Sequence, residues 1–155
     1  MRLHDMIGKQ YVLILVDSGA NASFINTDLA AKLERPTVEF TPTHFVAANG
    51  ASLVSSQVLP QLQWLCQGHS FVQDFQVLLI PCYDMILGAD WLENHSPMWV
   101  HWKQRWMRFT HNNKQVKLTE IQDQAQDIRP ISATRLHGLL RREAIVECLQ
   151  VQPVH

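Results

Sequence analysis

Asp17 is the residue of this sequence that is best placed for acid–base chemistry. It directly follows five apolar residues, 12–16, and is followed by Ser18, Gly19 and Ala20. A carboxylate at the end of a buried strand can act as a general base or acid, but an acid and a glycine at a strand end more often form only a turn. The Asp-Ser-Gly tripeptide is therefore a weak signal alone, and the neighbouring segments decide its meaning.

Two later segments give Asp17 a context. Asn49-Gly50 separates two extended runs and is the dipeptide that best suits a tight hairpin turn. Farther along the chain, Ile86-Leu87-Gly88 is an apolar pair followed by a glycine. An acid at a strand end, a hairpin and an apolar pair with a glycine, in this order, are far more specific than the tripeptide.

This arrangement resembles the retropepsin family of aspartic proteases, and most closely the protease segment of plant gypsy-type long-terminal-repeat retrotransposon polyproteins. The resemblance covers residues 1–109 and rests on the segments "LVDSGA", "VAANG" and "YDMILGADWL". It implies a mainly β, closed-barrel acid-protease fold with one or two short helices. It also implies an aspartic endopeptidase that uses neither a cofactor nor a metal.

The number of carboxylates determines how such a site can work. Amide hydrolysis without a metal or a nucleophilic side chain needs a base for water and an acid for the carbonyl oxygen, which two adjacent carboxylates supply. The sequence has one Asp-Ser-Gly, so the resemblance implies a homodimer with Asp17 of each subunit at the two-fold axis. The expected partners are a second copy and an extended peptide, by resemblance the retroelement's own polyprotein.

The resemblance also assigns roles to the residues after Asp17. The Ser18 hydroxyl would brace the active-site loop across the dimer axis, Gly19 would allow a close turn, and Ala20 would leave room for substrate. Two positions depart from viral usage: Ala89 stands where an arginine usually follows the glycine, and Asn21 stands where an acid is common. Detailed substrate contacts are therefore not carried over.

The other two segments receive supporting roles by the same resemblance. Asn49 and Gly50 would form the tip of a flap that grips an extended peptide and excludes water, although such a hairpin can also be an ordinary surface turn. Ile86, Leu87 and Gly88 would pack beneath the catalytic loop, which is a structural role with or without catalysis.

The elements that must position these residues are mostly strands. Alternating and continuous apolar patterns predict strands at residues 3–7, 10–16, 43–48, 51–59, 61–67, 71–79 and 85–87, and a Trp-rich hairpin over 98–109. Short helices are predicted at residues 26–34, capped by Asn26 or Thr27, and from about Asp90 to before Pro97.

Composition argues against several other functions. The net charge of −1 gives no polyelectrolyte character, so we expect no nucleic-acid partner for this segment. The tryptophans at 91, 99, 102 and 106 could stack bases, but without a basic surface they are assigned to the core or a dimer interface.

Metal and membrane sites are also not expected. His95, His101 and His111 fall on different predicted elements, and the three cysteines have no Cys-x-x-Cys spacing and are interpreted as buried thiols. No stretch approaches the length of a signal peptide core or a membrane span, so we expect a soluble, cytoplasmic protein.

The sequence predicts three parts. Residues 1–110 form the protease-like domain, residues 111–131 a polar linker, and residues 132–155 a short helix–strand extension. By resemblance the extension is the spacer that leads towards reverse transcriptase.

Two alternatives to the protease hypothesis remain open. One is a catalytically silent retropepsin-like module that dimerises or binds, derived from a fragmentary or host-adopted element. The other is an unrelated β-rich binding domain, in which Asp17 would be exposed and distant from Gly88.

Overall fold

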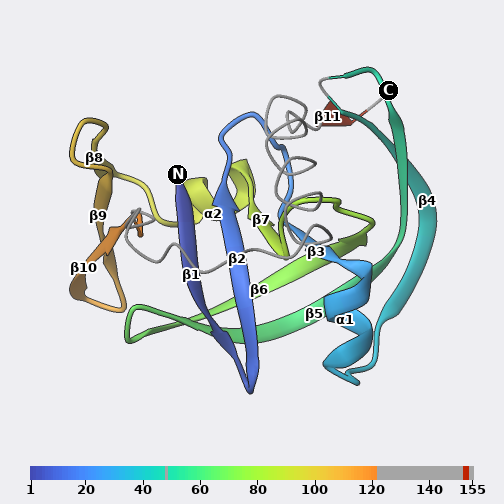
Figure 1. Cartoon of the computed structure of the whole chain (residues 1–155), viewed down its shortest axis with the longest axis horizontal. Coiled ribbons are helices and arrows are strands. Elements are labelled where there is room, and N and C mark those ends of the chain that lie inside the picture. Colours follow the sequence, from blue (N-terminus) through green and yellow to red (C-terminus); the bar gives the residue numbers. More distant parts are fainter. Residues whose placement is uncertain (48, 122–151, 154–155) are drawn as a thin grey trace, which may run out of the picture.

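Strands dominate the part of the chain that the structure, a computed structural model, describes: residues 1–47 and 49–121 and the backbone of residues 152–153 (Figure 1). The elements in chain order are β1 (Arg2–Ile7), β2 (Gln10–Val16), β3 (Phe24–Asn26), α1 (Thr27–Lys32), β4 (Val38–Val46), β5 (Ser52–Cys66), β6 (His69–Leu78), β7 (Met85–Leu87), α2 (Ala89–Asn94), β8 (Met98–His101), β9 (Trp106–His111), β10 (Lys114–Thr119) and β11 (Gln152–Pro153). Among these residues, neither six-residue helix is long enough to cross a membrane.

Two sheets build the fold. The larger has the strand order β1-β2-β7-β3-β6-β5-β4-β11, and the smaller is the antiparallel sheet β10-β9-β8. In the larger sheet β2 runs parallel to β7, and β3 runs parallel to β6. The strand β2 that precedes Asp17 is therefore an interior strand, with β1 on one side and β7 on the other.

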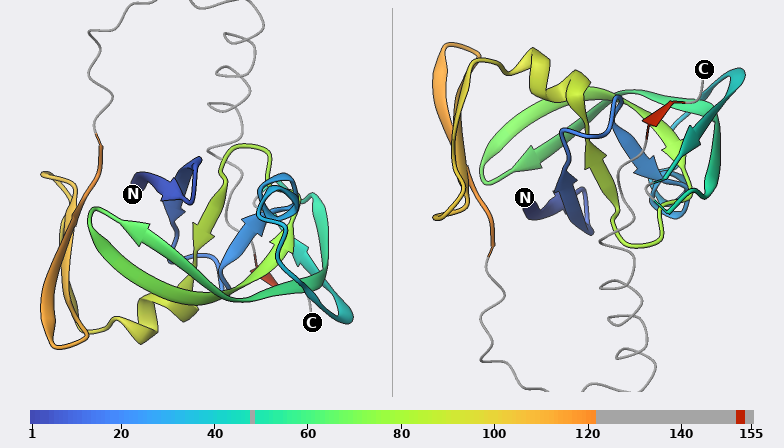
Figure 2. Two further views of the ribbon diagram at one scale, coloured as in Figure 1. Left: turned by 90° about the horizontal axis from the view of Figure 1, so that it is seen from below. Right: turned by 90° about the horizontal axis from the view of Figure 1, so that it is seen from above.

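The predicted closed barrel is wrong, because the large sheet is open. Its edges are β1 and the β4–β11 pair, and no backbone ladder joins them within the described residues. The 15-residue β5 curves across the sheet and packs beside β1 (Figure 2). There the Gln67 N–H donates to the Asp5 carboxylate, so a side chain makes the contact in place of the backbone ladder that closure requires.

Alternating side chains of the long strands form the core. In β5, Leu62, Trp64 and Cys66 are buried, whereas the residues between them are exposed. Trp64 stacks on Phe71 of β6 with ring centroids 4.8 Å apart. Because β-strand side chains point to opposite faces in turn, this pattern gives the sheet one apolar face.

The folded domain extends beyond the predicted boundary at residue 110. Residues 114–119, which the sequence composition assigned to a polar linker, form β10 and pair with β9. Val116 and Leu118 are buried in the same core cluster as Ile14 of β2. The rest of the linker, from residue 122, and the predicted helix of the extension lie outside the described residues.

Glu120 fixes the end of this folded region. Its carboxylate accepts hydrogen bonds from Arg2 Nε at 3.2 Å and Arg105 Nη1 at 3.3 Å. Burial alone would raise the pKa of Glu120, but the two guanidinium groups outweigh it and the net pKa is lowered. The carboxylate therefore stays charged and connects β1 to the β8–β9 turn.

Candidate active site

The backbone of Asp17 is held by the interior of the large sheet. Val16 is paired with Leu87 in the parallel β2–β7 ladder, and the Asp17 N–H donates to the Leu87 carbonyl over 3.0 Å. Ile86 and Leu87 are fully buried. The apolar run of the sequence thus places a carboxylate at the end of a strand that has neighbours on both sides.

The carboxylate of Asp17 is half-buried and partly satisfied by its own loop. The Gly19 N–H donates to Oδ1 over 2.8 Å, and the Ala20 N–H donates to the Asp17 carbonyl over 3.2 Å. Burial raises the pKa of Asp17, whereas the Gly19 hydrogen bond and the positive amino-terminus oppose that shift. Within residues 1–47 and 49–121, no second carboxylate contributes to this shift.

The residues after Asp17 differ in exposure. Ser18 is exposed, Gly19 is half-buried and Ala20 is fully buried. The Ala20 side chain packs in a second core cluster with Phe24 and Ile86. The exposed Ser18 is therefore the member of this loop that is open to another molecule.

Gly88 lies directly against the loop that carries Asp17. A Cβ at this position would be 2.2 Å from the carbonyl oxygen of Ala22 and 2.6 Å from that of Ala20. Next to it, the Ala89 N–H donates to the Ala20 carbonyl over 2.6 Å. The structure therefore brings the Asp17 and Gly88 segments together, which is the arrangement that the unrelated-domain alternative excludes.

A buried hydrogen-bond network joins this loop to the start of α2. Ser23 Oγ donates to Asp90 Oδ1 over 2.6 Å and accepts from the Gly88 N–H over 3.1 Å. The other Asp90 oxygen accepts from the Ser23 N–H over 3.0 Å and from Gln73 Nε2 over 3.2 Å. In the sequence, Asp90 stands out only as part of "ADWL", and Ser23 was missed because no local motif identifies it.

Replacing Ser23 by alanine tests this network. We expect a loss of about 1–3 kcal/mol of unfolding free energy, because the buried Gly88 N–H would lose its partner and Asp90 Oδ1 would keep only the Trp91 N–H. Urea denaturation measures the loss. Ser96→Ala is the matched control, since this exposed hydroxyl donates only to the Leu92 carbonyl, and a loss as large there would contradict the assigned role.

The β4–β5 hairpin carries the predicted flap tip. Its loop, residues 47–51, is longer than the two-residue turn that Asn49-Gly50 suggested. The Gly50 N–H donates to the Ala47 carbonyl, Asn49 Oδ1 accepts from the Ala51 N–H, and Gly50 has φ +81°. In Figure 1 this tip and the β2–β3 loop with Asp17 lie at the same, upper end of the view.

His95 and His111 take structural positions. His95 is buried against Trp91, with Nδ1 2.7 Å from the Trp91 carbonyl oxygen, and burial lowers the pKa of His95. His111 Nε2 lies 3.0 Å from the Ser70 carbonyl oxygen. In the described part of the chain, no three His, Cys, Asp or Glu side chains are grouped as a metal site would require.

A family model described as the PEG10/RTL1 protease domain matches residues 13–118. The chain belongs to the PEG10/RTL1 protease-domain family. The matched region of this PEG10/RTL1-type domain runs from β2 into β10, so it includes Asp17, the flap hairpin, Gly88 and most of the small sheet. A comparison with curated proteins finds no match.

The fold of this PEG10/RTL1-type domain is similar to that of a solved structure, the crystal structure of the retroviral protease-like domain of Ddi1 from Leishmania major. The two share 20% sequence identity with a TM-score of 0.62, over 81% of this chain and 96% of that one. This similarity confirms a retropepsin-like fold. The plant gypsy-type origin stays a prediction.

Proposed function

We propose that this chain is an aspartic endopeptidase that works as a homodimer, in which Asp17 of each subunit activates water. The observation that carries the proposal is the single half-buried carboxylate at the end of an interior strand, with its pKa raised by burial. A lone carboxylate cannot supply both the base and the acid, so a second carboxylate is needed. The loop with the exposed Ser18 leaves room for a second copy of the chain to bring its own Asp17.

The proposed mechanism needs one proton between the two Asp17 side chains. Two carboxylates in contact cannot both ionise easily, so one stays protonated while the other is charged. The charged Asp17 takes a proton from water as that water attacks the peptide carbonyl carbon, and the protonated Asp17 gives its proton to the carbonyl oxygen. The Asp17 that took the water proton then gives it to the amide nitrogen, and the C–N bond breaks to release the amine. One hydroxyl of the intermediate returns its proton to the other Asp17 as the carboxylic acid product forms, which restores the shared proton.

The edge of β4 supports a peptide substrate in extended form. The backbone of Gln152 and Pro153 pairs antiparallel with Val46 and Phe45, next to the flap tip. An unpaired strand edge can bind an extended peptide through its main chain, and this pairing is an example within the chain itself. By resemblance, the substrate we propose is the retroelement polyprotein.

Peptide cleavage between pH 4 and 7, with and without a statine inhibitor, tests the proposal. We expect inhibitor-sensitive cleavage that is lost as the pH rises through the raised pKa of the Asp17 pair, because the proton-sharing form then disappears. Specific activity should also fall on dilution, as dimers dissociate. The absence of inhibitor-sensitive cleavage at concentrations where sedimentation shows dimers would leave only the silent dimerisation module.

A further inference from the structure

The outer face of the small sheet concentrates aromatic and basic side chains. Residues 98–119 contain five Lys or Arg and no Asp or Glu, which leaves eight basic and fourteen acidic residues for the rest of the chain. The whole-chain charge of −1 therefore conceals a strongly basic segment. The net charge of the whole chain, which argued against a nucleic-acid partner, does not describe the charge of the small sheet.

The strand register places these side chains on one face. Trp99, Arg108 and Lys117 lie opposite one another across β8, β9 and β10. Trp106 lies two residues before Arg108 in β9, and therefore on the same side of the sheet. The alternate residues, such as Met107 and Leu118, are buried in the core. We call the outward set the Trp–Arg face, which consists of Trp99, Trp106, Arg108 and Lys117. The exposed Lys103 lies in the adjoining β8–β9 turn.

Aromatic rings and cations alternate along the Trp–Arg face. The Arg108 guanidinium lies 5.5 Å from the ring centre of Trp99 and 5.9 Å from that of Trp106, and Lys117 Nζ lies 4.8 Å from the Trp106 ring. Trp106 Nε1 donates to Gln104 Oε1 over 2.9 Å, which fixes the indole. Trp99 is 53% exposed and Trp106 is partly exposed, so aromatic surface on this face remains open to solvent.

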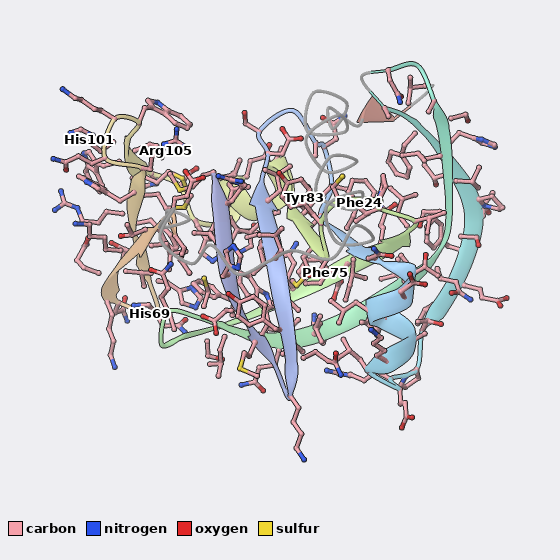
Figure 3. All side chains as sticks on the ribbon, viewed as in Figure 1. Phe24, His69, Phe75, Tyr83, His101 and Arg105 are labelled. Atoms are coloured by element: carbon pink, nitrogen blue, oxygen red, sulfur yellow. The ribbon has the colours of Figure 1, made fainter. Side chains whose placement is uncertain are left out.

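The cations of this face are free to bind an anion. Arg105, at the same turn, is paired with Glu120, but none of Lys103, Arg108 and Lys117 forms an ion pair with a carboxylate of the described residues. The small sheet also lies at the opposite end of the molecule from the flap hairpin in both Figures 1 and 2. In Figure 3 the labelled His101 and Arg105 mark this end of the molecule.

We propose that the Trp–Arg face binds single-stranded nucleic acid, with bases stacked on Trp99 and Trp106 and phosphates bound by Arg108, Lys117 and Lys103 of the adjoining turn. Unpaired bases offer flat surfaces to aromatic side chains while the backbone follows cations, which is the combination present here. A second copy is a poor occupant, because a two-fold interface would place the same cations against each other. A duplex fits less well, because a flat sheet face gives no element that enters a groove.

Fluorescence anisotropy with labelled dT12 and U12 and the full chain tests this binding. Three phosphate contacts predict a salt slope of about −2, so affinity should fall about 20-fold between 50 and 200 mM salt. The Arg108→Gln/Lys117→Gln variant should flatten that slope to about −0.7. Trp99→Ala should weaken binding at least about 5-fold through lost stacking.

The matched control is Lys9→Gln/Lys32→Gln, which removes two exposed cations on the β1–β2 turn and α1. It makes the same change in net charge, so it should leave the affinity for dT12 unchanged. The proposal is wrong if wild type does not bind at 50 mM salt, or if both double variants lose affinity equally. It is also wrong if polyglutamate binds as tightly as dT12 and Trp99→Ala has no effect, since the face would then recognise acidic protein. None of these outcomes depends on proteolysis.

Discussion

Asp17→Asn is expected to lower the rate of peptide cleavage by about 10²–10⁴-fold while leaving the fold intact. The asparagine keeps the shape of the side chain but can neither accept the proton of water nor share one with its partner. Since burial disfavours the charged form of Asp17, the neutral variant should have an equal or higher melting temperature. Initial cleavage rates and a thermal melt measure the two effects.

Asp28→Asn is the matched control, because it removes an exposed carboxylate of α1 outside the site. Its cleavage rate should equal that of wild type. A mixing experiment separates a shared site from a complete one in each chain: an equal amount of Asp17→Asn protein is added to a fixed amount of wild type. If dimers exchange freely, half of the wild-type subunits acquire an inactive partner and the rate halves. An unchanged rate would mean that one chain holds the whole site.

Gly88→Ala is expected to destabilise the protein by about 3 kcal/mol or more and to abolish cleavage. At φ −95° any residue could adopt this backbone, so the need for glycine comes from space alone. The added methyl group would meet two backbone carbonyl oxygens, those of Ala20 and Ala22, neither of which can rotate away. The loop that follows Asp17 would have to move, and urea denaturation together with cleavage assays would detect it.

Gly8→Asn serves as the comparison for that substitution. Gly8 has φ +58°, and no atom lies within 4 Å of the place that a Cβ would take. Glycine is therefore favoured at this position by its left-handed backbone conformation, and not by a lack of space for a side chain. Asparagine tolerates this left-handed conformation, and we expect a loss below about 1 kcal/mol. Should Gly88→Ala prove equally mild, the close packing of the loop on Gly88 would not limit stability.

The strands that the sequence predicted best are those with a strong local signal. The hairpin of residues 3–7 and 10–16 is observed as β1 and β2, and Asn26 caps α1 by accepting from the Asp28 N–H. The strand β10 was missed because Val116 and Leu118 alternate with polar residues, and average composition hides a period of two. The alternation of apolar and polar residues in this segment indicates a strand, although its average polarity is typical of a linker.

Contacts between distant segments could not be predicted. Two strands were expected on either side of Pro60, yet β5 continues through a register shift, where the Gln61 N–H donates to Asp74 Oδ1 over 2.8 Å. In the site, Asp17 has a motif, but Ser23 gains its role from Asp90, 67 residues away. The fold brings these two residues together, and no local sequence pattern predicts their hydrogen bond.

The ion pair between Arg2 and Glu120 has a consequence for how the domain is made. These residues are 118 positions apart, and Val116 and Leu118 belong to the same core cluster as Ile14 of β2. Contacts between residues so far apart in the sequence form slowly, because the entropy cost of closing the long loop must be met before the contact adds stability. During synthesis, the core cluster that contains Ile14 of β2 is therefore completed only after the last strand of the small sheet has left the ribosome. A nascent chain that stops short of that strand would carry β2 in an incomplete core.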